Sequence, residues 1–215
     1  EERAFGDLGP LLAAAFREAA ERDGFRIALP DEGIRATVIG ASQYTTQLSG
    51  GTIFVTPQDL LPLRNLPVIA PDLPLDDVVL SPEAIAVAIG GTLAQMELVD
   101  ADGPVGLFVR WRGSASFARL DGFCRGILAG LAPVLTDGRP VVLAGDSDVG
   151  GLIGIHIREE MKAAVPVVSI DGLDLKPFDF IDIGEILPAS GAVPVVIKSL
   201  VFPADSALGR PRVLR

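Results

Sequence analysis

A chain of 215 residues with 49% hydrophobic side chains is long enough for one large domain or two small ones around a packed core. With 28 acidic and 18 basic side chains its net charge is -10, which argues against nucleic acid or an anionic membrane as its partner. One cysteine and one histidine exclude an internal disulfide and a Cys/His zinc site. No apolar run reaches the roughly 18 residues of a membrane span. The opening EERAFGD is not a signal peptide, so we expect a cytoplasmic protein, and the missing initiator Met predicts a piece of a longer one.

The N-terminal part is predicted to contain one helix and several short strands. Apolar residues recur at helical spacing over Leu8–Arg22, before Gly24, which predicts an amphipathic helix. Short apolar runs then predict strands at Phe25–Leu29, Thr37–Gly40, Thr52–Val55 and Val68–Ala70. We expect Thr37–Gly40 and Thr52–Val55 to form a hairpin around the residues between them.

The segment ATVIGASQYTTQLSGGTIFV, residues 36–55, is a candidate phosphate loop. Its glycines, Gly40, Gly50 and Gly51, can adopt positive φ and leave room for a ligand, and its Ser and Thr hydroxyls can hydrogen-bond to phosphate. The segment matches neither a Walker loop nor a dinucleotide-binding fingerprint, and the same residues are typical of ordinary hairpin turns. Both interpretations stay open. In so acidic a chain, a bound nucleotide would need backbone N–H groups and Mg²⁺ to neutralise it.

Helices and strands alternate in the middle of the chain. Ser81 as N-cap and Pro82 at the first helical position predict a helix that runs through Leu98. Gly90 and Gly91 lie inside this helix, which predicts close packing on a sheet. The elements expected next are a strand at Val105–Trp111, a helix at Ser116–Leu131, a strand at Pro140–Ala144, a helix at Val149–Ala164 and a strand at Val167–Ile170.

The resulting order βββαβαβαβ predicts an α/β fold with a mixed sheet, right-handed crossovers and helices on both faces. Three leading strands followed by αβ units are the ribonuclease-H-like plan of each lobe of the actin and Hsp70 ATPases. We therefore expect residues 1–170 to form such a lobe, βββαβαβ with flanking helices. Residues 171–215 should form a β-rich appendage, either continuous with the sheet or a small barrel-like flap.

Three segments resemble the ethanolamine ammonia-lyase reactivating factor (EutA) family: VIGASQYTTQLSGGTI, PVVLAGDSDVGGLIG, and FDFIDIGEIL followed by VPVVIKSLVF. The resemblance runs from about Leu8 to Phe202 and implies the C-terminal half of a family member. It implies an ATP-dependent chaperone that releases damaged cobalamin from inactivated ethanolamine ammonia-lyase, so that intact adenosylcobalamin can bind. The implied cofactors are ATP and Mg²⁺, the implied partners are the lyase and ATP or ADP, and the implied location is the cytoplasm or a bacterial microcompartment.

The same resemblance implies nucleotide contacts, because nucleotide lies between two homologous lobes in the actin and Hsp70 clan. The second phosphate loop would consist of Gly40, Ala41, Ser42, Gln43, Tyr44, Thr45 and Thr46. The adenosine-contacting loop would fall on Trp111–Ser116, with Gly113 and Ser114 as contacts, although it has one glycine where the clan has a pair. Asp182-Ile183-Gly184 lacks the Thr of the first phosphate loop and is interpreted as structural. Any ATPase activity would need the N-terminal lobe, and no catalytic residue is assigned.

Two loops carry side chains with a structural and a functional interpretation. Arg112 is either solvated or balances phosphate charge, and Trp111 either belongs to the core or stacks on a base. Asp146 and Asp148 either cap the helix expected at Val149 or contact ribose hydroxyls or a Mg²⁺-bound water.

Two residues with reactive side chains receive structural interpretations. His156 is expected to pair with Glu160 at i+4 on the helix surface. Cys124 is expected to be a small buried apolar residue.

Three functions remain open from the sequence. The first is the ATP-dependent reactivase, in which nucleotide shifts the lobes between arrangements that bind the lyase differently. The second is a non-catalytic interaction module with an ATPase-like fold. The third is a sugar or carboxylate kinase lobe of the same clan.

Overall fold

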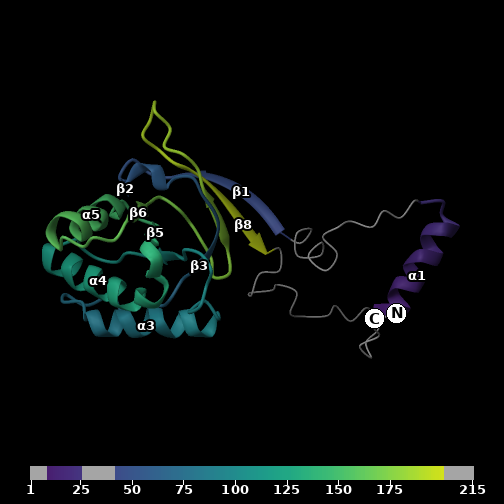
Figure 1. Ribbon diagram of the computed structural model, residues 1–215, viewed down its shortest axis with the longest axis horizontal. Helices are drawn as coiled ribbons and strands as arrows, with labels where there is room; N and C mark the ends of the chain where they lie inside the picture. The colour runs from purple at the N-terminus through teal and green to yellow at the C-terminus, as the bar shows by residue number, and fades with distance from the viewer. Residues whose placement is uncertain (1–8, 26–41, 201–215) are drawn as a thin grey trace, which may run out of the picture. The chain divides into compact units, whose positions relative to one another are not determined.

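The computed structural model describes residues 9–25 and 42–200 (Figure 1). The chain divides into two units, residues 1–41 and 42–215, and each is described by itself. In the first unit α1 (Gly9–Arg22) ends two residues before Gly24, which has a φ of +74°, and this confirms the predicted helix. The strands predicted at Phe25–Leu29 and Thr37–Gly40 lie outside the described residues, apart from Phe25, which belongs to no strand.

The second unit has the order βββαβαβαβ followed by two further strands, but its first strand is Ser42–Leu48 and not the predicted Thr37–Gly40, which lies outside the described residues. The predicted strands and the first two predicted helices of the middle of the chain have counterparts within a few residues of their expected bounds. The helix predicted at Val149–Ala164 is α-helical only over Gly150–Ile155 and continues as a π-helix over His156–Glu160. The elements are β1 (Ser42–Leu48), β2 (Phe54–Thr56), β3 (Leu63–Ile69), α3 (Pro82–Gln95), β4 (Gly106–Val109), α4 (Phe117–Gly130), β5 (Val141–Gly145), α5 (Gly150–Ile155), β6 (Val167–Ile170), β7 (Phe180–Ile183) and β8 (Pro194–Leu200).

The strands form one mixed sheet in the order β1-β8-β7-β3-β4-β5-β6-β2. Neighbours from β3 to β6 are parallel, and the other pairs are antiparallel. Parallel neighbours need crossover connections, which α3, α4 and α5 provide. Since β7 pairs with β3, the segment after residue 170 continues the sheet, one of the two arrangements expected for it. A domain boundary at residue 170 stays a prediction.

One strand of the predicted hairpin, Thr37–Gly40, lies outside the described residues, so its pairing with Thr52–Val55 stays a prediction. Residues 42–48, expected in the loop of that hairpin, form the strand β1 instead, and β1 and β2 lie at opposite edges of the sheet. β1 pairs with β8, while β2 pairs with β6. The Gly-rich connection between them is held by other segments: Ser49 N–H donates to Val193 O and Gly50 N–H donates to Asp171 O, each at 2.9 Å. It is therefore a crossing connection, and not a tight turn between paired strands.

Two hydrophobic clusters fill the two faces of the sheet. Side chains alternate along the parallel strands, so that Leu107 and Leu143 pack with α3, α4 and α5 on one face. Phe108 and Val142 point to the opposite face. There they pack against side chains of β7 and β8, because the sheet curls over itself, and against the connecting segment that carries Leu175. The described helices of this unit thus cover one face, whereas the sequence predicted helices on both.

Among the α-helices described in the second unit, only α3 begins at a residue whose side chain accepts a capping hydrogen bond. Ser81 caps α3 as predicted, since its Oγ accepts a hydrogen bond from Ala84 N–H at 3.2 Å, and Pro82 occupies the first turn. The α5 helix starts after Val149, and no side chain caps it. The interpretation of Asp148 as a helix cap is therefore wrong.

Helices α3 and α4 lie side by side (Figure 1), and glycines of α4 allow this contact. A Cβ on Gly122, Gly126 or Gly130 would lie within 3 Å of atoms of α3 or of the residue before its cap. Gly90 and Gly91 of α3 have open space around the same position, so the close packing predicted for them is wrong. Within residues 9–25 and 42–200, no helix is long and apolar enough to cross a bilayer.

Candidate functional site

Polar side chains gather where the parallel strands end. In open α/β sheets ligands bind outside the carboxyl ends of the strands, because the connecting loops can vary there without disturbing the core. The loops after β3, β4, β5 and β6 place charged residues at this edge. They are Asp72 and Asp76, Arg110 and Arg112, Asp146, and Asp171 with Asp174, respectively.

A pocket of about 280 Å³ lies at the ends of β3 and β4. Its charged walls are Arg110, Arg112, Asp72 and Asp76, and its apolar walls include Phe108, Leu73 and Leu75. The volume is at the lower limit of typical ligand sites, which begin at about 300 Å³. Such a pocket suits one polar group of a ligand better than a whole cofactor.

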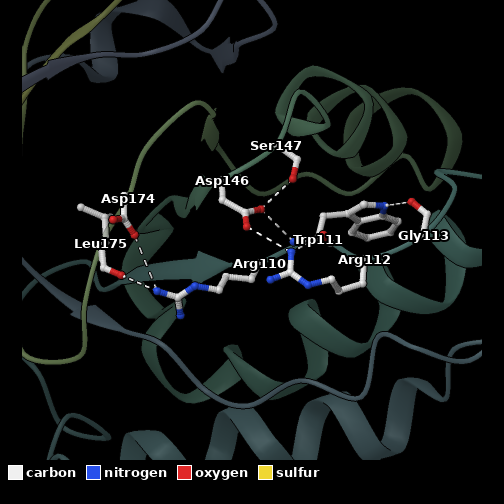
Figure 2. Close-up of polar contacts among 8 residues, drawn as sticks. All are labelled: Arg110, Trp111, Arg112, Gly113, Asp146, Ser147, Asp174 and Leu175. Atoms are coloured by element: carbon white, nitrogen blue, oxygen red, sulfur yellow. Dashed lines mark hydrogen bonds and ion pairs between the residues drawn. The ribbon is translucent and has the colours of Figure 1, made fainter. Parts of the chain in front are cut away.

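Arg110 is oriented by the segment that follows β6 (Figure 2). Its Nη2 donates to Leu175 O at 3.1 Å and lies 3.7 Å from Asp174 Oδ1. The guanidinium also stacks over the Phe108 ring, 4.8 Å from the centroid. Because a guanidinium has five N–H donors and these contacts use one nitrogen, Arg110 keeps donors for an anionic ligand.

Asp146, directly after β5, forms hydrogen bonds with the residues that follow β4 (Figure 2). Its Oδ1 accepts hydrogen bonds from Trp111 N–H at 3.0 Å and from Ser147 Oγ at 2.7 Å. Arg112 Nη1 donates to Asp146 Oδ2 at 3.2 Å and to Trp111 O at 2.9 Å. Asp146 thus orients Arg112 and forms an ion pair with it.

Trp111 belongs to the core, which supports the structural interpretation of this residue. It is 5% exposed, and its indole meets the Phe123 ring edge-on at 5.3 Å. Its Nε1 donates to Gly113 O at 3.0 Å, and Gly113 has a φ of +74°. The indole therefore holds the turn at Gly113 and is not available to stack on a base.

Arg119 of α4 is a buried cation that the sequence analysis missed. Its guanidinium donates to Leu75 O at 2.6 Å, to Asp77 O at 2.7 Å and to Arg112 O. Among the described residues no carboxylate lies within ion-pair distance of it. These hydrogen bonds connect the loop after β3 to the loop after β4, and both loops line the pocket. The signal in the sequence was an arginine on the apolar face of a predicted helix.

The two segments predicted to contact nucleotide are not brought together. Gly40 and Ala41 lie outside the described residues, and residues 42–46 form part of the edge strand β1, in which Tyr44, Thr45 and Thr46 are exposed. Gly113 and Ser114 lie in the loop after β4, and β8, β7 and β3 separate β1 from β4. Gly50 and Gly51 do not have positive φ. Nucleotide contact by these segments stays a prediction.

His156 and Cys124 lie away from this edge. His156 is buried, with Nε2 3.3 Å from Asp121 Oδ1, so the predicted surface pair with Glu160 is wrong. A hydrogen bond from Arg125 holds the pKa of Asp121 below its usual range, which keeps the carboxylate ionised. Cys124 is fully buried as predicted, and burial raises the pKa of its thiol to about 12.

The sequence of this chain is similar to proteins of ethanolamine utilisation. A family profile described as ethanolamine utilisation protein EutA matches residues 1–203. The ethanolamine ammonia-lyase reactivase EutA of Salmonella typhimurium is 33% identical over 201 residues, which cover 93% of this chain and 40% of that protein. The reactivase of the same name from Escherichia coli is 31% identical over 202 residues, with the same coverage of both chains.

These matches cover nearly all of this chain but only part of its relatives. The chain spans about two fifths of the length of the two reactivases. No solved structure matches it. Because the family profile and both relatives extend over more than nine tenths of the sequence, the chain belongs to the EutA family of ethanolamine utilisation proteins.

Proposed function

We propose that this chain is part of a reactivase for ethanolamine ammonia-lyase. The observation that carries the proposal is its identity of 33% and 31% to two curated reactivases over almost its whole length. Because it spans two fifths of those proteins, reactivation would be a property of a longer protein, to which this chain contributes its C-terminal half. That protein would act where the lyase is, in the cytoplasm or in a bacterial microcompartment.

The proposed mechanism is ATP-dependent release of damaged cobalamin from the inactivated lyase, after which intact adenosylcobalamin binds. In such a cycle nucleotide shifts the protein between two arrangements with different affinity for the lyase. The ribonuclease-H-like plan of actin and Hsp70 lobes is part of this proposal. It is supported by the order βββαβαβαβ of the second unit.

We assign the phosphate groups of the nucleotide to the pocket at the ends of β3 and β4. Arg110 and Arg112 supply guanidinium donors to it, and guanidinium groups bind phosphate through paired hydrogen bonds. Asp72 and Asp76, in the same lining, suit the water shell of a Mg²⁺ ion carried by the nucleotide. Residues 40–46 and 113–114 remain the alternative assignment for nucleotide contact.

A non-catalytic interaction module is the second candidate. It is favoured by the separation of the two predicted nucleotide segments by three strands, and by the exposure of β1 at the sheet edge. An edge strand presents unpaired backbone groups, so it can pair with a strand of another protein. Under this alternative the chain would bind the lyase without nucleotide.

The experiment is recovery of cyanocobalamin-inhibited ethanolamine ammonia-lyase by the longer parent protein, with adenosylcobalamin and with or without Mg-ATP. We expect recovery only with Mg-ATP. Recovery without nucleotide would select the interaction module, and no recovery with a competent lyase would reject the reactivase. Phosphoryl transfer to a small sugar or carboxylate would select the kinase lobe.

Nucleotide binding by the same protein tests the pocket. Because a hydrogen bond to a charged group contributes about 1.5–3 kcal/mol, Arg112→Gln should weaken Mg-ATP binding at least about tenfold. Lys162→Gln, which removes an exposed cation outside the pocket lining, is the control and should bind as the wild type does. Loss of binding in the Thr45→Ala/Thr46→Ala double variant, with Arg112→Gln unaffected, would move the site to β1.

A further inference from the structure

Asp171, the residue after β6, has a fully buried carboxylate with one oxygen unpaired. The residue is 0% exposed. Thr52 Oγ1 donates a hydrogen bond to its Oδ2, whereas its Oδ1 has no hydrogen-bond partner among the described residues. A buried oxygen without a donor is costly, so its presence at a loop next to the sheet edge points to a missing partner.

A second carboxylate converges on the same place. A Cβ added to Gly50 would overlap Asp171 Oδ1 and would lie 3.5 Å from Asp148 Oδ1. Both oxygens therefore border the space that a side chain at Gly50 would fill. Asp148 itself is exposed, so this space is open to solvent on one side. The contact also explains why a glycine stands at position 50, where φ does not require one.

Charge is not balanced at this cluster. Among the described residues no Lys or Arg lies within ion-pair distance of Asp171 or Asp148, although Asp146 two residues earlier is paired with Arg112. Burial raises the pKa of Asp171, and the Asp148 charge adds to this, while the Thr52 hydrogen bond and the nearby backbone N–H groups of Gly150 and Gly50 oppose it. A cation between the two carboxylates would supply the missing partner and cancel the repulsion.

We propose that Asp171, Asp148 and Thr52 form a binding site for a divalent cation of the Mg²⁺ or Ca²⁺ class. The donor set consists of carboxylate and hydroxyl oxygens, which these hard cations prefer, and it offers no nitrogen or sulfur ligand. Two carboxylates match the double charge, and water entering beside Asp148 completes the coordination. The site lies outside the arginine pocket, and it does not depend on the proposed function.

Calorimetric titration of the metal-stripped 215-residue chain with MgCl₂ and, separately, CaCl₂ tests the site. We expect one saturable event per chain for at least one of the two ions. Asp148→Asn should weaken this binding at least tenfold, because it removes a ligand charge from an exposed position without disturbing packing. Asp102→Asn, at an exposed acid of the α3–β4 loop, is the matched control and should bind as the wild type does.

Urea unfolding of the same proteins provides a second readout that does not depend on calorimetry. The ion that binds should raise the unfolding midpoint of the wild type, in proportion to the logarithm of its concentration above Kd. Asp171→Asn keeps the side-chain shape, and its midpoint should not respond to that ion. No saturable binding of either ion at millimolar concentration would overturn the proposal, as would binding by Asp148→Asn and Asp171→Asn equal to that of the wild type. If the unfolding midpoint of the wild type rises on acidification and does not change with either ion, Asp171 is protonated in the folded protein and does not bind a cation.

Discussion

The contact between α3 and α4 allows a sharp test with two glycine-to-alanine variants. At Gly126 a new Cβ would lie 2.7 Å from Ile85 Cβ and 2.9 Å from Pro82 O. At Gly91 on α3 the same group would meet no atom within 4 Å. Both glycines lie in helix interiors, so both substitutions gain the same helix propensity, about 1 kcal/mol. The difference between the two variants therefore isolates the packing of the two helices.

We expect Gly91→Ala to raise the free energy of unfolding by about 0.5–1 kcal/mol. Ordinary van der Waals contact begins near 3.4 Å, so Gly126→Ala must push α3 and α4 apart or distort the backbone at Pro82. Overpacking of this kind costs about 1–3 kcal/mol. Gly126→Ala should accordingly unfold with a free energy about 1–3 kcal/mol below that of Gly91→Ala, since the gain in propensity cancels.

Equilibrium urea denaturation of the 215-residue chain, followed by far-ultraviolet circular dichroism, measures both values. The midpoint of Gly126→Ala should lie below that of Gly91→Ala, with an unchanged slope if the surface exposed on unfolding is the same. Equal stability of Gly126→Ala and Gly91→Ala would refute the close approach of α4 to α3, and with it the reason for the glycines at intervals of four in α4. A further variant, Gly122→Ala, should resemble Gly126→Ala, because its Cβ would lie 2.6 Å from Leu80 O.

Three other outcomes follow from local contacts. Ser81→Ala should lower the free energy of unfolding by about 1 kcal/mol, measured by urea denaturation, because it removes the cap of α3, and Ser81→Asn should restore it. Burial acts against ionisation of Asp182, but hydrogen bonds from Lys198 Nζ at 2.8 Å and Asn65 N–H at 2.6 Å hold its pKa below the usual range. The stabilisation that the ionised Asp182 carboxylate contributes is therefore complete above the unfolded pKa of about 3.9 and is lost as the pH falls through the folded pKa. Below pH 4 the free energy of unfolding of Asp182→Asn should accordingly depend less steeply on pH than that of the wild type, measured by urea denaturation. Cys124 should resist a thiol reagent at pH 8 in the native protein and react on unfolding, because burial raises the pKa of its thiol to about 12; native-state labelling would contradict its burial.

The local elements could be predicted from the sequence because their signals are local. Ser81-Pro82 marks the start of α3, and the apolar run before Asp171 marks β6, within the chain segment that forms each element. The pairing of β1 with β8 could not be predicted, since Pro194–Leu200 is distant in sequence and its residues contain no pattern that identifies β1 as the partner strand. The Gly and Ser residues after β1 suit a hairpin turn as well as a crossing connection, so their pattern did not reveal that residues 42–48 form a strand at the edge of the sheet opposite to β2.

The candidate site was predicted in part. Arg112 and Asp146 were singled out as loop residues after strands, and the structure joins them in one ion pair. Arg119 was overlooked because a helical arginine is usually solvent-exposed, and its partners are backbone carbonyls, which leave no pattern in a sequence. The unpaired oxygen of Asp171 is likewise invisible in sequence, because it depends on how the connection through Gly50 crosses the end of β6.

The charged side chains at the sheet edge are either already paired with another side chain or buried without a charged partner, and a ligand affects these two groups differently. Asp146 is already satisfied by Arg112 and by two further donors, so a ligand that approached it would have to replace existing hydrogen bonds. Asp171 is buried and unpaired at Oδ1, and Arg119 is buried with backbone carbonyls as its partners. Electrostatic interactions are strongest where water is excluded, so an ion of opposite charge gains most at such groups. Asp171 borders open solvent through Asp148, whereas Arg119 is covered by the loops it ties together. An added cation should therefore act on the stability of this unit through Asp171, while anions should act on the pocket through Arg110 and Arg112.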